Sequence, residues 1–125
     1  MLKVDNLYKT ISVNRGDENQ SFSFSIPTSD LESYTFQIGD IVKFGVYEAN
    51  KLDENAVLLK EYTIDEAKTK VTLNFDKNDF VIGDLINKPV TYWYEIQLNG
   101  NTIIGYDEDG AKEFILYPEG SDIKW

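Results

Sequence analysis

The sequence predicts an all-β fold, an antiparallel β-sandwich, and three observations support this prediction. Short segments alternate apolar and polar residues with the period of two that is typical of half-buried strands. Turn-forming pairs precede or join several of these segments, at Gly16-Asp17, Gly39-Asp40 and Asn99-Gly100. Such pairs form tight turns because glycine and asparagine tolerate a positive φ, and an Asp side chain bonds its own backbone. No segment keeps a helical period over three turns, so we expect strands joined by turns.

Eight segments carry this alternation between turn residues. They span residues 7–14, 20–27, 41–47, 57–64, 70–76, 90–98, 101–106 and 112–117. Because successive side chains of a strand point to opposite faces, the alternation also assigns residues to the core or to the surface. The clearest apolar faces consist of Phe22, Phe24 and Ile26; of Val42, Phe44 and Val46; and of Val71, Leu73 and Phe75.

Segment 90–98 has aromatic residues on both faces. One face carries Tyr92, Tyr94, Ile96 and Leu98, and the other carries Thr91, Trp93, Glu95 and Gln97. Trp93 is therefore expected to stand among polar side chains. The alternatives are burial beneath a loop and, if the register is shifted by one residue, burial against the second sheet.

Two short segments are candidates for a single helical turn, residues 77–81, where acidic and amide side chains are able to cap it, and residues 29–33. Residues 36–40 and 80–84 share the pattern Phe-x-Ile-Gly-Asp, which is typical of a recurring loop. No linker rich in Pro, Gly or Ser divides the chain. Residues 1–125 are expected to form one domain.

The composition supports a real core and removes several chemistries. A chain of 125 residues with 42% hydrophobic residues is large enough to fold without disulfide or metal cross-links. Zero cysteine excludes disulfides, thiolate metal sites and a cysteine nucleophile. Zero histidine removes the usual general base and the commonest ligand of zinc, copper and non-haem iron. We expect no cofactor.

The charge disfavours nucleic acid as a partner. Twelve basic and 22 acidic residues give a formal charge of −10, which repels phosphate backbones. The acids are scattered and not gathered in a tail, which favours a role in solubility. Electrostatic docking to a basic partner is the alternative.

The amino-terminal residues lack the apolar region of a signal peptide. No stretch approaches the roughly 18 consecutive apolar residues that a membrane span needs. We expect no membrane partner, and a cytoplasmic location before any assembly into a larger particle.

The tripeptide Arg15-Gly16-Asp17 matches an integrin-binding sequence, which presents a cation and an anion on a hairpin tip. A turn in which Gly16 takes a positive φ and Asp17 caps the bend explains the same residues. Since no secretion signal is visible, the structural turn is favoured.

The loop 107–110, Asp-Glu-Asp-Gly, places several oxygen donors together, as calcium requires. The EF-hand spacing and its flanking helices are absent. A solvated acidic hairpin is therefore favoured, and the same holds for residues 53–55. We expect no metal site.

Catalysis has little support in the sequence. Two carboxylates roughly 5 to 10 Å apart are able to hydrolyse a glycosidic bond, but among 22 acids no pair stands out. The Ser and Thr residues have no histidine and no Ser-x-x-Lys motif to activate them. We expect no catalytic residues.

Exposed aromatic residues are the surface feature of greatest interest. Trp93, with Tyr92 or Tyr106, is able to stack on sugar rings or to anchor a protein interface. A carbohydrate-binding module is therefore one functional hypothesis.

The order of turns and strands resembles the amino-terminal modules of upper baseplate and related tail-associated proteins from phages and prophages of low-GC Gram-positive bacteria. The resemblance extends over about residues 8 to 120. The residues that carry it are Arg15-Gly16-Asp17 with Phe22 and Phe24, Gly39-Asp40-Ile41-Val42-Lys43-Phe44, Tyr92-Trp93-Tyr94-Glu95-Ile96-Gln97-Leu98, Asn101-Thr102-Ile103-Ile104-Gly105 and Phe114-Ile115-Leu116-Tyr117-Pro118-Glu119.

The resemblance implies an Ig-like sandwich of seven to eight strands that serves as a non-catalytic part of a virion tail or baseplate. Its partners would be other tail or baseplate proteins, and a homo-oligomer is a further expectation. Exposed sheet edges would serve in assembly, because they offer unpaired N–H and C=O groups. The loop lengths fit both an Ig and a jelly-roll strand order.

Overall fold

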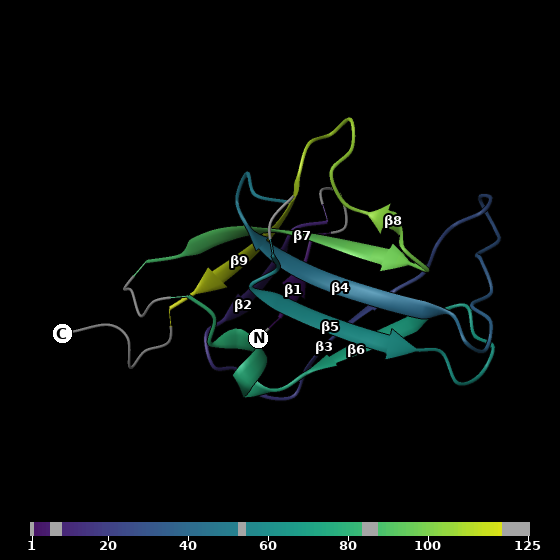
Figure 1. Ribbon diagram of the computed structural model, residues 1–125, viewed down its shortest axis with the longest axis horizontal. Coiled ribbons are helices and arrows are strands. Elements are labelled where there is room, and N and C mark those ends of the chain that lie inside the picture. The colour runs from purple at the N-terminus through teal and green to yellow at the C-terminus, as the bar shows by residue number, and fades with distance from the viewer. Residues whose placement is uncertain (1, 6–8, 53–54, 84–87, 119–125) are drawn as a thin grey trace.

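The computed structural model describes residues 2–5, 9–52, 55–83 and 88–118. Its strands form two facing sheets (Figure 1). The strands are β1 Lys3–Val4, β2 Ile11–Asn14, β3 Gln20–Phe24, β4 Ile41–Glu48, β5 Leu58–Thr63, β6 Val71–Phe75, β7 Val90–Leu98, β8 Asn101–Ile104 and β9 Lys112–Tyr117. Every predicted segment contains a strand, so the all-β prediction is confirmed. The additional strand, β1, has two residues and is too short to show a period.

The strand order is that of an immunoglobulin-type sandwich. The larger sheet has seven strands in the order β1-β2-β9-β7-β4-β5, with β8 paired to β7. β3 and β6 form the second sheet. The series β9-β7-β4-β5 facing β3-β6 corresponds to the G-F-C-C′ and B-E strands of immunoglobulin domains.

One strand pair departs from the antiparallel prediction. β2 runs parallel to β9, with Ile11 opposite Phe114 and Val13 opposite Leu116. A parallel pair needs a long connection, and here nearly the whole chain lies between the two strands. β1 pairs with β2, so both amino-terminal strands join the larger sheet.

The core lies between the sheets, on the faces that the alternation predicted. Phe44 of β4 is fully buried at its centre. Its ring centroid lies 5.4 Å from that of Phe75, 5.6 Å from that of Tyr94 and 6.4 Å from that of Phe114. The predicted apolar faces of segments 20–27, 41–47 and 70–76 are confirmed, since their members are buried or pack against the core.

The predicted turns are confirmed by their backbone geometry. Gly16 and Gly39 have φ angles of 79° and 92°. Asn99 and Gly100 have φ angles of 50° and 86°, which suit the tight turn between β7 and β8.

One of the two predicted helical turns is confirmed. Residues Lys77–Phe80 form a 3₁₀ turn, η1, whose N-cap is Asp76. The helical prediction for residues 29–33 is wrong. That segment is a loop at the right-hand end of Figure 1, where the Thr28 N–H donates to the Glu32 carbonyl at 2.9 Å.

The segments 36–40 and 80–84 share two structural features, although Phe36 forms a β-bridge and Phe80 ends η1. Phe36 and Phe80 are both fully buried, and Gly39 and Gly83 both have a positive φ. Asp84 lies outside the described residues.

Candidate functional site

The outer face of the larger sheet carries the aromatic residue that the sequence singled out. Tyr92, Tyr94 and Ile96 of β7 point into the core and are buried. Trp93 therefore points outward, where it is partly exposed. The predicted register of β7 is confirmed.

Pairing between strands places further groups beside Trp93. Tyr47 of β4 is its partner on one side and Glu113 of β9 on the other. The Tyr106 ring, 62% exposed, lies with its centroid 5.8 Å from that of Trp93 at an interplanar angle of 52°. We call Tyr47, Trp93 and Tyr106 the aromatic face.

Tyr47 belongs to a polar cluster on this face. Its ring lies over Gly45, where a Cβ would stand 2.8 Å from the Tyr47 hydroxyl oxygen. That hydroxyl donates to Glu95 Oε1 at 3.4 Å, and Gln97 Nε2 donates to the same oxygen at 2.9 Å. Burial, the Glu95 charge and the hydrogen bond to Glu95 raise the pKa of Tyr47.

The arrangement suits binding more than proton transfer. Aromatic rings stack on flat apolar surfaces, and a carboxylate accepts hydrogen bonds from hydroxyl or amide groups. These properties fit a sugar ring and also a protein surface.

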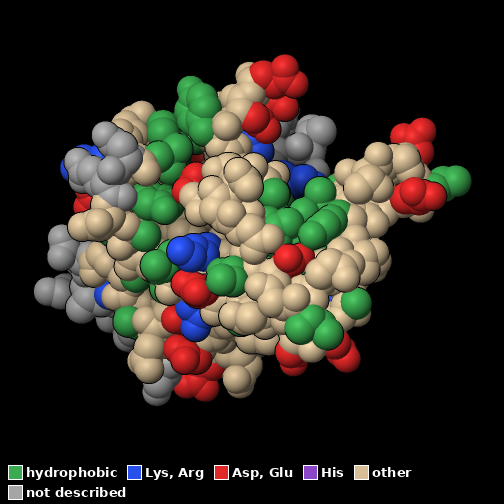
Figure 2. Space-filling view, turned by 45° about the vertical axis from the view of Figure 1, so that its right-hand side comes forward, with side chains coloured by type: hydrophobic (Ala, Val, Ile, Leu, Met, Phe, Trp, Pro, Cys, Tyr) green, Lys and Arg blue, Asp and Glu red, His purple; other side chains and the backbone are tan. Residues whose placement is uncertain are grey.

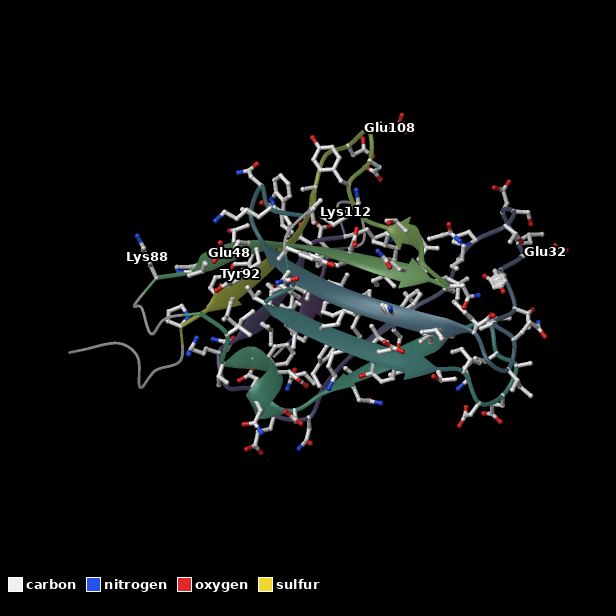
Figure 3. All side chains as sticks on the ribbon, viewed as in Figure 1. Glu32, Glu48, Lys88, Tyr92, Glu108 and Lys112 are labelled. Atoms are coloured by element: carbon white, nitrogen blue, oxygen red, sulfur yellow. The ribbon has the colours of Figure 1, made fainter. Side chains whose placement is uncertain are left out.

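One predicted member of this surface is corrected. Tyr92 is 7% exposed and lies on the core side of β7, so it shares no surface with Trp93. Tyr92 is one of the side chains labelled in Figure 3. Tyr47 was missed because its position depends on the pairing of β4 with β7, which local alternation does not reveal.

Arg15 has a structural role in the turn that the sequence compared with an integrin motif. Its guanidinium donates to the carbonyls of Ile82 at 2.5 Å, Val81 at 3.0 Å and Gly83 at 3.4 Å. The Gly16 N–H donates to the Phe80 carbonyl at 3.1 Å. The turn thus holds the segment that follows η1.

The acidic loop before β9 binds the ammonium group of Lys112, the first residue of β9. Asp107 Oδ1 accepts from Lys112 Nζ at 2.8 Å and from the Asp109 N–H at 2.9 Å. The Lys112 bond is the main reason why the pKa of Asp107 is lowered. Figure 3 shows Glu108 at the top of this loop, with Lys112 below it.

Within the described part of the chain, no three acidic side chains gather as a metal site would require. Residues 53 and 54, part of the second acidic segment, lie outside the described residues.

A cleft of about 970 Å³ runs beside β3. Its walls include β3, residues of β1 and β8, and the segment between β8 and β9. This cleft was not predicted, because its walls come from strands far apart in the sequence.

Acidic side chains are spread over the surface. Figure 2 shows them around the visible face, with fewer basic side chains among them. This distribution accords with the formal charge of −10.

The fold defines an immunoglobulin-type β-sandwich with an aromatic outer face and an open cleft. No protein-family model matches the chain, and no curated protein matches it. Among the described residues, no helix has the length and apolar character to cross a membrane.

Proposed function

We propose that this protein is a non-catalytic docking module that holds other proteins in a phage or prophage tail or baseplate. The observation that carries the docking proposal is the aromatic face, where Trp93 and the exposed Tyr106 ring lie together on the outer side of a sheet. Aromatic side chains of this kind anchor protein interfaces, because they bury large area with few rotatable bonds.

The non-catalytic part of the proposal is supported by composition. The chain has neither histidine nor cysteine. The clearest carboxylate arrangements, at Glu95 and Asp107, are held by neighbouring donors. The aromatic face offers stacking and hydrogen bonding, which suffice for docking.

The tail or baseplate part of the proposal comes from the resemblance in the order of turns and strands. The Arg15 turn leads into β3, the Gly39-Asp40 turn leads into β4, and β7 turns through Asn99-Gly100 into β8. This order of elements is the feature on which the resemblance depends.

The proposal is tested on particles released after prophage induction and purified by density gradient. Mass spectrometry should find this chain in intact particles at a fixed ratio to the other tail proteins. Its absence from particles that contain every other tail component would contradict the proposal.

The same aromatic face supports a second candidate function, carbohydrate binding. Trp93 and Tyr106 offer rings for stacking, and Glu95 and Gln97 offer polar groups for sugar hydroxyls. Since Trp125 also fluoresces, the titration uses a Trp125→Phe background. A saturable change in Trp93 fluorescence with cell-wall glycan, lost in Tyr106→Ala, would favour this function over protein docking.

A further inference from the structure

The cleft follows the edge of β3. Seven consecutive residues, 21–27, line it, and the first four of them belong to β3. Successive side chains of a strand point to opposite faces, so only a cleft along the strand edge meets all of them. Within the described residues, β6 is the one strand that pairs with β3. The edge of β3 that lies opposite β6 faces this cleft.

The hydrogen bonds of β6 show which backbone groups of β3 point into the cleft. The Tyr62 hydroxyl donates to the Asn74 carbonyl at 2.7 Å and accepts from the Asn74 N–H at 3.0 Å. Both backbone groups of Asn74 therefore point away from β3. Asn74 stands opposite Ser21, so this is a pair without mutual hydrogen bonds.

The alternation of an antiparallel ladder extends this result to Ser23. Ser23 stands opposite Thr72, two residues along, and belongs to the same class of pair. The 2.8 Å contact between their hydroxyl oxygens agrees with the closer approach in such pairs. The N–H and C=O groups of Ser21 and Ser23 therefore point toward the cleft.

The two edges of this small sheet differ. On the β6 edge, the Tyr62 hydroxyl satisfies Asn74. At the β3 edge, Leu2, which precedes β1, contributes one bond at the start, from its N–H to the Gln20 side chain at 2.7 Å. β1 itself pairs with β2 in the larger sheet, so the place beside Ser21 and Ser23 is open among the described residues.

The cleft defines the side chains of a strand that would fill this place. Residues opposite Phe22 and Phe24 would point between the sheets, toward the apolar wall formed by Ile103 and Ile104. Residues opposite Ser21 and Ser23 would point outward with the serines. An alternation of apolar and small polar residues fits both sides.

Charge favours an uncharged segment from a different protein. The cleft is lined by three lysines, Lys9, Lys70 and Lys112, and by three acids, Asp107, Asp109 and Glu113, and their formal charges cancel. The whole chain has a charge of −10, so a second copy would be repelled.

We propose that β3 accepts an extended, uncharged segment of a partner protein, which alternates apolar with small polar residues and adds a third strand to the small sheet. Strand addition of this kind gains affinity from backbone hydrogen bonds and specificity from alternate side chains. This proposal deepens the docking function proposed above and rests on it.

The first test is amide hydrogen exchange of the isolated protein, followed by NMR. The Ser21 and Ser23 amides should exchange at least about tenfold faster than the Phe22 and Phe24 amides, which pair with β6. Slow exchange at Ser21 and Ser23 would mean that the chain itself already covers the edge, and would overturn the proposal.

The second test adds a synthetic peptide of sequence acetyl-Gln-Thr-Val-Thr-Val-Thr-Val-Gln-amide. At saturating, millimolar peptide, exchange at Ser21 and Ser23 should slow by about tenfold or more. The same peptide N-methylated at both its threonines and its valines should have no effect, because N–H donors are then lost on both of its edges. No protection by the unmodified peptide would overturn the proposal.

Proline substitutions supply a matched pair of variants. Ser23→Pro removes a donor that points into the cleft, whereas Thr72→Pro removes one that points away from it. Both lose the contact between the two hydroxyls and keep the ladder between β3 and β6. Peptide affinity should fall about tenfold or more in Ser23→Pro and stay near wild type in Thr72→Pro. Equal affinities in the two variants would contradict binding at this edge.

These measurements use only the isolated protein and a peptide. If the peptide does not bind, β3 is not a docking site. Docking through the aromatic face is then still tested by mass spectrometry of the particles. Conversely, if this chain is absent from the particles, the proposed tail function is contradicted, but peptide binding at β3 is not.

Discussion

The Arg15 guanidinium donates to the Ile82 carbonyl at 2.5 Å and thereby ties the turn after β2 to the segment after η1. The two residues are 67 positions apart in the chain. Bonds to Val81 and Gly83 complete the contact. The sequence Arg15-Gly16-Asp17 matches an adhesion motif, but its Arg15 side chain bonds backbone carbonyls of the same chain.

Arg15→Ala should lower the free energy of unfolding by about 1–3 kcal/mol, because hydrogen bonds from a charged donor are lost at a partly buried site. Urea denaturation measures this. Arg15→Lys should recover only part of the loss, since an ammonium cannot reach three carbonyls with the fork of a guanidinium. Unchanged stability in Arg15→Ala would contradict the structural role.

Tyr94→Phe should destabilise the protein by about 1–2 kcal/mol. The Tyr94 hydroxyl donates to the Lys9 carbonyl, and burial raises the pKa of Tyr94, which keeps the donor protonated. Tyr106→Phe is the control, because that side chain is 62% exposed and its loss should change stability by less than about 0.5 kcal/mol. Equal effects in the two variants would argue against the Tyr94 bond.

Phe44→Ala should lower the free energy of unfolding by about 3–5 kcal/mol, since it opens a cavity among three aromatic rings. Chemical denaturation again gives the value. Leu59→Ala, at a side chain that is 57% exposed on the outer sheet face, should have a small effect. A loss below about 1 kcal/mol at Phe44 would place the centre of the core elsewhere.

The pair of Asp107 and Lys112 should make stability depend on acidity. Because the pKa of Asp107 is lowered in the folded state, mainly by Lys112, its contribution is present above the ordinary Asp pKa of about 3.9. The contribution is lost as the pH falls through the lowered folded value. NMR titration of the Asp107 carboxyl should give a midpoint below about 3.9.

Lys112→Met is the matched variant for this titration. It removes the cation without leaving a buried charge, and it should raise the Asp107 midpoint toward the ordinary value. Asp40, whose pKa is lowered chiefly by the Gln37 N–H, should titrate alike in both proteins. An Asp107 midpoint that does not respond to Lys112→Met would refute the pair.

The alternation of residues in the sequence predicted which side chains are buried, because strand geometry converts a period of two directly into faces. It placed Tyr94 and Phe44 in the core and Trp93 outside. Local sequence does not specify which strands pair. The parallel contact of β2 with β9, the position of Tyr47 beside Trp93 and the edge of β3 that no described strand covers all depend on pairing between distant segments.

We propose that this sandwich docks to other proteins of a tail particle through a defined surface. The most direct test compares the number of chains per purified particle for wild type, Ser23→Pro and Thr72→Pro, by quantitative mass spectrometry after induction. Wild type and Thr72→Pro should be incorporated at the same ratio, and Ser23→Pro about tenfold less. Absence of the wild-type chain from complete particles would contradict the proposal. Equal incorporation of all three chains would mean that the docking surface does not include the edge of β3.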